Sequence, residues 1–333
     1  MKGFSNRLSC MRAVLSLAAA LVFAASAAIV PDEQFVPKTI LEAVVRIQGT
    51  AGNGTGSVID KKPQYDRFGN QIGWFLCVLT ANHVVKNSQD LTVGFNNIGN
   101  PHGAPYSAWI AAEGRFKDLG GKSPDIAILG VKAQLNDFLN RLTPLNVIDD
   151  TNYNPGDPFT VVGYGFTGFQ QDINGDGVPD GYREVAGTYG NKRFANNTFD
   201  RKINTAWGQW SHDAWEYDLT GPAPGIDGEG FPLRGDSGGP LLVQSPVGIP
   251  IQTQPPRVIN AFTRGIVGIV SDGDYFHGNF VRWNLEKERD VRITPLYKDW
   301  IMRECEAVPE PSSILALMTA TILIVVRRRR TRV

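Results

Sequence analysis

Three short segments of this chain carry the side chains that attack on a carbonyl group requires. Gly235-Asp236-Ser237-Gly238-Gly239-Pro240 sets a serine among glycines, which permit a tight turn with positive φ and leave space for converging N–H groups. His83 follows the apolar run 74–79, and Asp125 precedes the apolar run 126–129. A serine nucleophile, a histidine base and an aspartate that orients the base form a catalytic triad. Separately, each segment also fits a polar turn, a structural histidine or a strand-edge aspartate.

Together, the segments resemble the motifs of the chymotrypsin-like (trypsin-fold) serine proteases. Thr80-Ala81-Asn82-His83, Asp125-Ile126-Ala127-Ile128 and the serine segment occur in that family's order of His, Asp, Ser. The resemblance implies that His83 is general base and then general acid, that Asp125 orients it, and that Ser237 is the nucleophile. It also implies an oxyanion hole formed by the N–H groups of Gly235 and Ser237, and a protein or peptide substrate. Asn82 departs from the family, which usually has a small residue there.

The same resemblance extends to weaker features of the chain. Gly163-Tyr164-Gly165 is similar to a strand of the second barrel, and Ser271, Asp272 and Gly273 lie in a segment similar to the strand that binds substrate backbone. Phe231 lies where the family sets the floor of its specificity pocket, which implies a shallow apolar pocket. Asp227, Glu229 and Asp272 remain alternatives as acidic groups for a basic substrate side chain.

Composition favours an all-β fold. The chain has 36 glycines and 21 prolines, its apolar runs are short, and turn signals recur between them. With the resemblance, this predicts two tandem six-stranded Greek-key barrels, about 29–148 and about 149–306, followed by a short C-terminal helix. Triad residues would then come from both barrels. The other histidines, His102, His212 and His277, are expected on the surface or in loops.

The N-terminal segment 1–28 has the pattern of a secretory signal peptide. Lys2, Arg7 and Arg12 are basic, the stretch 13–25 is apolar, and small residues follow. We therefore expect an exported protein that a signal peptidase processes. Cleavage after Ala28 would leave Ile29 as the first residue, and cleavage after Ala27, which would leave one extra alanine, is the alternative. In the trypsin-like family such an end pairs with the aspartate before the nucleophile, so the resemblance implies activation by contact of Ile29 with Asp236.

The C-terminal segment 307–333 resembles the PEP-CTERM sorting tail of Gram-negative bacteria. Pro309-Glu310-Pro311 precedes the apolar run 314–326 and the basic cluster 327–330. The run is shorter than the roughly 20 residues of a full bilayer span, and the arginines are expected on the cytoplasmic side. The resemblance implies transient membrane insertion through the tail as a transmembrane helix, processing by an exosortase, and a place at the cell surface, in the outer membrane or outside the cell. An ordinary C-terminal membrane anchor is the alternative.

The predicted protease domain, residues 29–306, is acidic. Of 33 basic and 33 acidic residues, eight basic and one acidic lie in the two expected tails, which leaves 25 basic and 32 acidic residues and a net charge of −7. A nucleic-acid-binding domain needs a basic face, so we expect no nucleic acid partner.

Cysteine use fits an oxidising compartment. Once Cys10 leaves with the signal peptide, Cys77 and Cys305 remain. In trypsin-like folds the strand before the catalytic histidine packs on the C-terminal helix, so the resemblance implies a disulfide between these two cysteines. Two buried free thiols are the alternative.

A further segment has the spacing of a calcium-binding loop. Asp172, Asn174, Asp176 and Asp180 occupy positions 1, 3, 5 and 9, with Gly177 at position 6. Arg183 stands where an EF-hand has its bidentate glutamate, so we expect a structural Ca²⁺ loop without EF-hand helices. A plain Asx/Gly turn is the alternative.

The sequence thus predicts an exported serine endopeptidase. Its alternative is a catalytically silent protein of the same fold that binds partners at the surface or in the matrix.

Overall fold

The computed structural model describes most of the chain between the two expected tails. Residues 1–37, which include Ile29, and residues 309–333 lie outside the described residues, as do Asp180, Asp227, Glu229, His102 and His277. The described ranges are 38–95, 105–114, 121–176, 181–218, 230–244, 264–273, 280–282 and 287–308.

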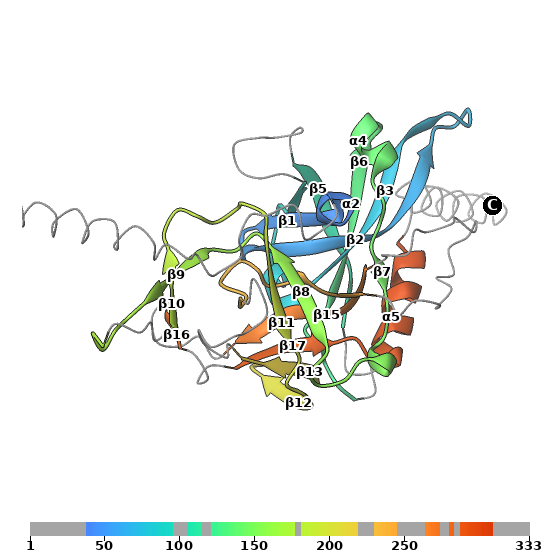
Figure 1. The fold of residues 1–333 in the computed structure, drawn as a ribbon. Helices are drawn as coiled ribbons and strands as arrows, with labels where there is room; N and C mark the ends of the chain where they lie inside the picture. Colours follow the sequence, from blue (N-terminus) through green and yellow to red (C-terminus); the bar gives the residue numbers. More distant parts are fainter. Residues whose placement is uncertain are drawn as a thin grey trace, which may run out of the picture.

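Six strands close the first barrel, as predicted, in the order β1-β2-β3-β6-β5-β4 (Figure 1). The strands are β1 (Val44–Gly49), β2 (Gly52–Tyr65), β3 (Gln71–Thr80), β4 (Thr92–Gly94), β5 (Tyr106–Glu113) and β6 (Ala127–Gln134). β3 is buried without a break from Phe75 to Thr80, because one of its faces lines the barrel and the other faces the C-terminal helix. This explains its continuous apolar run.

The second half contains an eight-stranded sheet in the order β11-β8-β14-β15-β17-β13-β12, with β7 parallel to β15. Its described strands are joined as an open sheet with edges at β11 and β12, not as a closed barrel. The chain changes sheets between β6 and β7. The strands are β7 (Asn146–Val147), β8 (Pro158–Gly163), β11 (Arg193–Thr198), β12 (Arg201–Trp207), β13 (Trp210–Tyr217), β14 (Pro240–Gln244), β15 (Arg264–Gly273) and β17 (Glu288–Arg292).

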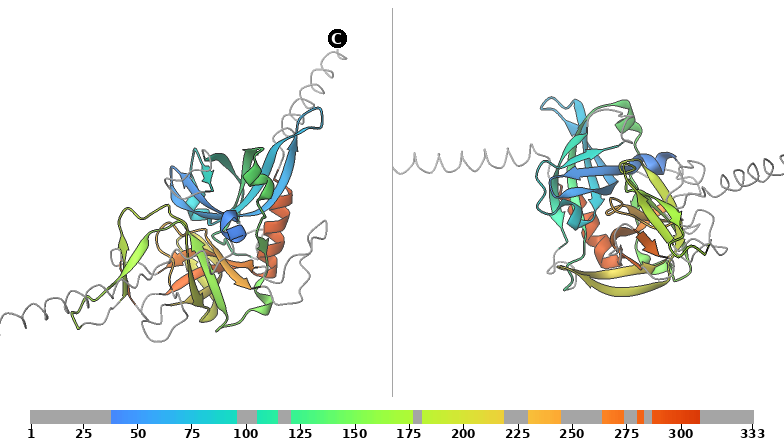
Figure 2. Two further views of the ribbon diagram at one scale, coloured as in Figure 1. Left: turned by 45° about the horizontal axis from the view of Figure 1, so that its top comes forward. Right: turned by 90° about the vertical axis from the view of Figure 1, so that its left-hand side faces the viewer.

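A small third sheet lies beside this one, with strand order β16-β10-β9. It comprises β9 (Thr167–Gln171), β10 (Gly181–Val185) and β16 (Phe280–Arg282). Figure 2 shows this sheet at the periphery of the second half.

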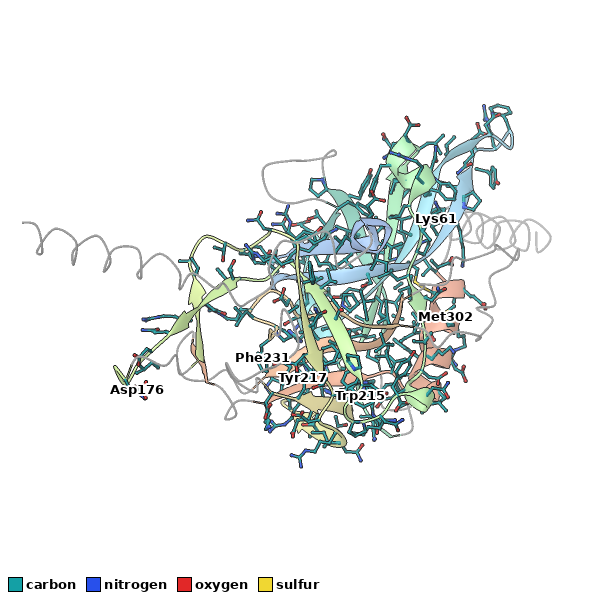
Figure 3. All side chains as sticks on the ribbon, viewed as in Figure 1. Lys61, Asp176, Trp215, Tyr217, Phe231 and Met302 are labelled. Carbon is teal, nitrogen blue, oxygen red and sulfur yellow. A yellow bond between two sulfur atoms is a disulfide. The ribbon has the colours of Figure 1, made fainter. Side chains whose placement is uncertain are left out.

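Aromatic rings fill part of the core of the second half. Phe199 stacks between Phe159 and Trp215, with ring centroids 4.4 and 4.0 Å away. Tyr217 packs edge-on against Phe159 at 4.7 Å and against Phe231 at 5.8 Å (Figure 3). Such stacked and edge-on pairs contribute beyond the burial of their area.

The predicted C-terminal helix is confirmed as α5 (Pro295–Glu306). Thr294 caps it by accepting a hydrogen bond from Tyr297 N–H at 3.3 Å, and Pro295 occupies the first turn. The helix buries Trp300 and Ile301. Four shorter helices complete the described elements: α2 (Lys38–Ala43), α3 (Asn82–Val85), α4 (Asp137–Arg141) and the 3-10 helix η1 (Asp150–Asn152).

A disulfide joins Cys305 of α5 to Cys77 of β3, with a Cα–Cα distance of 5.7 Å. It spans 228 residues of sequence and links the end of the chain's last described helix to the first barrel.

Within the described ranges, no helix is long and apolar enough to cross a membrane. The apolar run 314–326 lies beyond those ranges.

Candidate active site

His83 and Asp125 meet because β3 and β6 pair side by side. The register joins Thr80 to Ala127, so the residues after β3 and before β6 come to the same edge of the barrel. His83 Nδ1 lies 2.5 Å from Asp125 Oδ2, and the backbone N–H of His83 donates to Asp125 Oδ1 at 2.7 Å. Two hydrogen bonds to one carboxylate fix the orientation of the imidazole.

Asp125 is fully buried yet ionised. Burial alone would raise its pKa, but the charge of His83 and the hydrogen bonds from His83 and Ser271 outweigh it, so the pKa of Asp125 lies below its usual value. Ser271 Oγ donates to Asp125 Oδ2 at 2.7 Å. Both carboxylate oxygens therefore have partners, as a buried charge requires.

Backbone geometry shapes the serine segment. Gly235 and Gly238 have φ of +94° and +86°, values that residues with a Cβ rarely adopt. A Cβ at Gly238 would lie 2.1 Å from Thr55 O and 2.2 Å from Thr80 Oγ1. The glycine thus lets the segment pack directly on the end of β3, which leads to His83. Ser237 itself is partly exposed.

Thr55 of β2 holds the serine segment on the first barrel. Its N–H donates to Ser237 O at 2.8 Å and its Oγ1 donates to Gly235 O at 2.9 Å. The same Oγ1 accepts from Tyr164 N–H at 3.0 Å. One buried threonine therefore joins three segments that are far apart in the sequence.

Asp236 points away from the serine into the interior. Its Oδ1 accepts from Gly165 N–H at 2.6 Å and its Oδ2 from Leu233 N–H at 2.9 Å. Burial raises its pKa to about 6, although those two N–H groups and nearby Arg193 oppose the rise. A Cβ at Gly163 would lie 1.9 Å from Asp236 Oδ1, so the Gly163-Tyr164-Gly165 segment is shaped to this carboxyl group.

Two tryptophans flank His83. Trp207 ends β12 and Trp210 begins β13, and their rings stack with centroids 5.0 Å apart. Both present to the His83 ring in T-shaped geometry, at 5.4 and 6.0 Å. The hairpin is tied down where Lys86 Nζ donates to Gln209 Oε1. It therefore bridges the second sheet to α3 of the first half.

Comparisons with known proteins identify a distant likeness. No family model matches the chain, and no curated protein matches it. Two solved structures of Rv3671c match over most of their length. One, from Mycobacterium tuberculosis H37Rv, is a serine-to-alanine mutant in an inactive form: it is 16% identical, with 86% of this chain and 98% of that chain covered and a TM-score of 0.44. The other is the Rv3671c protease in an inactive form: it is 18% identical, with 78% and 93% covered and a TM-score of 0.39.

The predicted substrate-binding residues do not lie together: Phe231 is in the core of the second half, whereas Ser271, Asp272 and Gly273 are on β15. Phe231 is buried in the aromatic core against Tyr217, with 2% of its surface exposed. Ser271 faces Asp125, whereas Asp272 and Gly273 continue β15 and pair in register with Arg289 and Glu288.

The described part of the predicted calcium loop forms a tight turn. Asp172 Oδ1 accepts from Gly175 N–H at 2.6 Å, and Asn174 Oδ1 accepts from Asp176 N–H at 2.9 Å. In the described part of the chain, no three His, Cys, Asp or Glu side chains gather as metal ligands. Asp180 lies outside it.

Three features of this site were not expected from the sequence. The hydrogen bond of Ser271 to Asp125, the bridging role of Thr55 and the tryptophan pair all depend on contacts between residues more than 100 positions apart. The expectation of a surface or loop position was wrong for His212, which is fully buried, because β13 is an interior strand paired with both β12 and β17.

Proposed function

We propose that this protein is an exported serine endopeptidase of the trypsin-like kind. The observation that carries the proposal is the buried, ionised Asp125 with both oxygens bonded to His83. This arrangement holds the imidazole with its Nδ1–H on the carboxylate and leaves Nε2 free to accept a proton. The serine segment is hydrogen-bonded to Thr55 of β2 and packs at Gly238 on the end of β3, which supports Ser237 as the group whose proton Nε2 accepts.

The reaction then follows from these roles. Ser237 Oγ attacks the peptide carbonyl carbon while its proton passes to His83 Nε2, and the negative oxygen is bound by the N–H groups of Gly235 and Ser237. The C–N bond breaks as His83 returns the proton to the leaving amine. Water then attacks the acyl-enzyme and gives one proton to His83. His83 passes that proton to Ser237 Oγ as the ester bond breaks, which releases the carboxyl product.

Fluorophosphonate labelling of the exported protein tests this function. The reagent reacts with activated serines, so we expect labelling of the parent and none of Ser237→Ala. A Ser57→Ala variant, which changes a buried serine of β2 instead of Ser237, should be labelled like the parent. A folded parent that resists labelling would contradict the proposal and favour the catalytically silent binding protein.

Calcium is part of the proposal as a structural ion of the loop that begins at Asp172. The alternating oxygen side chains and the positive φ of Gly175, +77°, support it. Ca²⁺ would bind the loop between β9 and β10 and raise the stability of the protein without entering the chemistry. Equal melting temperatures with Ca²⁺ and with a chelator would refute it.

Export and sorting complete the proposal. Residues 1–28 are the signal peptide, and 307–333 are the PEP-CTERM tail that inserts in a membrane before an exosortase processes it. Cleavage before Ile29 would supply an ammonium group for Asp236. N-terminal sequencing of the exported protein tests this start point directly, since an end at Ala28 or later than Ile29 excludes it.

A further inference from the structure

Four large apolar side chains are exposed at one end of the first barrel. Tyr65, Phe68 and Ile72 lie at the tip of the β2–β3 hairpin, with exposed fractions of 55%, 73% and 46%, and Leu135 follows β6 with 45%. We call these four residues the hairpin patch. They are four of the seven exposed large apolar side chains in the described ranges. Single exposed apolar residues are ordinary, but a cluster indicates an interaction surface.

The tip that carries the patch is a built turn. Asp66 Oδ1 accepts from Phe68 N–H at 2.8 Å and from Asn70 N–H at 2.9 Å, and Gly69 has a φ of +86°. Leu135 N–H donates to Ile72 O at 3.4 Å, which places the end of β6 beside the hairpin. The views in Figures 1 and 2 show that the hairpin projects beyond the rest of the barrel. The apolar side chains are therefore presented outward by an ordered element.

The chemistry of the patch is that of a water–lipid boundary. It combines Tyr65 and Phe68 with two aliphatic side chains, and the Arg67 guanidinium lies 4.6 Å from the centroid of the Phe68 ring. Aromatic residues with an adjacent cationic side chain are typical of segments that lie in the headgroup region of a bilayer. The neighbouring carboxylate of Asp66 accepts backbone hydrogen bonds within the turn.

The chain leaves the described fold beside this hairpin. Lys62 Nζ, on β2, donates to Cys305 O at 3.0 Å and to Glu306 O at 3.1 Å, and the disulfide to Cys77 fixes the same end of α5. Figure 3 shows Lys61 on β2 and Met302 on α5 on the same side of the molecule. The last turn of α5 is thereby held against the base of the hairpin.

The hairpin tip and the start of the apolar tail segment are each a similar length of chain away from the contact between Lys62 and the end of α5. The apolar run begins at Ile314, six residues after Val308, so it starts within roughly 20 Å of the end of the described chain. Phe68 is six residues beyond Lys62 along the hairpin, three in β2 and three in the turn, so it lies at most about 20 Å from Lys62. A bilayer that holds the tail segment would therefore lie within reach of the tip.

We propose that the hairpin patch rests on the bilayer surface into which the C-terminal apolar segment inserts. This inference depends on tail insertion but not on catalysis. The protein would then contact the membrane at two places. The tail is the anchor, and the hairpin is a second contact that fixes the tilt of the protease domain. The patch contacts lipid only while the tail is present, so removal of the tail would release the domain.

A depth measurement with one fluorescent probe tests the proposal. The exported protein with its C-terminal tail intact, in which the remaining Cys77 and Cys305 are bonded to each other, receives Phe68→Cys labelled with an environment-sensitive dye. The matched control is Ala206→Cys, at an exposed position on β12. Both are reconstituted in vesicles of phosphatidylethanolamine and phosphatidylglycerol, with and without lipids that carry a nitroxide near the headgroup. Melting curves confirm that both labelled proteins fold.

We expect a blue-shifted emission for the Phe68→Cys probe and at least twofold quenching by the nitroxide lipid, with neither change for Ala206→Cys. In a Tyr65→Ser/Ile72→Ser background the quenching should fall by at least half. Equal behaviour of the two probes overturns the proposal. So does a blue shift that depends on protein density and not on nitroxide lipid, because a second copy would then cover the patch. A chain that does not float with the vesicles overturns both the tail insertion and the patch contact.

Discussion

Ser271 Oγ donates a hydrogen bond to Asp125 Oδ2, the same oxygen that faces His83 Nδ1, at 2.7 and 2.5 Å respectively. One carboxylate oxygen therefore connects β15 of the second sheet to the histidine of the first barrel. The contact makes Ser271 a positioning residue for the site.

Substitution Ser271→Ala should lower kcat by about 10- to 100-fold, because a hydrogen bond to a buried charged group contributes about 1.5–3 kcal/mol. KM should change little, since the hydroxyl faces Asp125 and not the substrate. The matched control is Ser57→Ala, whose buried Oγ has no hydrogen-bond partner among the described residues and whose loss should leave kcat unchanged. A parallel fall in both variants would show a general packing effect.

The tryptophan pair should affect reactivity through His83. Substitution Trp207→Ala removes the ring 5.4 Å from the imidazole, and an edge-on aromatic pair contributes about 0.5–1.5 kcal/mol beyond its buried area. We expect the rate of fluorophosphonate labelling to fall by about 2- to 10-fold. Trp74→Ala on the outer part of β3 is the control, because it also removes a partly buried tryptophan. Equal loss in the control would remove any special role of Trp207.

The disulfide should stabilise the folded protein. Replacing both Cys77 and Cys305 by serine should cost about 2–5 kcal/mol, since the bridge closes a loop of 228 residues in the unfolded chain. For a protein of this size, that corresponds to a fall of roughly 5–15 °C in melting temperature. Reduction of the wild-type protein should give the same shift, and no further shift should occur when the variant is reduced. A variant that melts with the wild type would show that the bridge carries no stability.

Asp236 should make stability depend on pH. Burial raises its pKa from 3.8 to about 6, so the folded state binds this proton more tightly than the unfolded state. The resulting stability is complete below pH 3.8 and is lost as the pH rises through 6, by about 3 kcal/mol in total. Denaturant titrations between pH 4 and 7 should show the decline in the parent and not in Asp236→Asn.

The exposed Asp299 of α5 provides the control, because Asp299→Asn should keep the parent's decline. Asp125 has the opposite effect in a different pH range. Because its pKa is lowered in the folded state, its contribution to stability is lost only as the pH falls below the pKa of the unfolded state. A decline that persists in Asp236→Asn would assign it to another group. A chain cut before Ile29 should lose the decline if the new ammonium group pairs with Asp236.

The sequence by itself determined the local elements of this protein. The alternation of short apolar runs with Gly- and Pro-rich turns predicted the all-β class. The glycines around Ser237 indicated a tight turn, and Gly235 and Gly238 indeed have positive φ. These features are set by backbone preferences and by hydrophobic periodicity, which act over a few residues.

The family resemblance implied that His83 and Asp125 share a site, and only the tertiary structure decided how they meet and which further residues join them. The β3–β6 register brings His83 to Asp125, and Thr55, Ser271 and Trp207 reach the site from strands whose positions depend on the packing of two whole sheets. Packing also placed Phe231 in a core of aromatic rings and left the second sheet open at β11 and β12 in the described residues. Such contacts depend on how whole strands pair and pack, and no local pattern of side chains encodes that pairing.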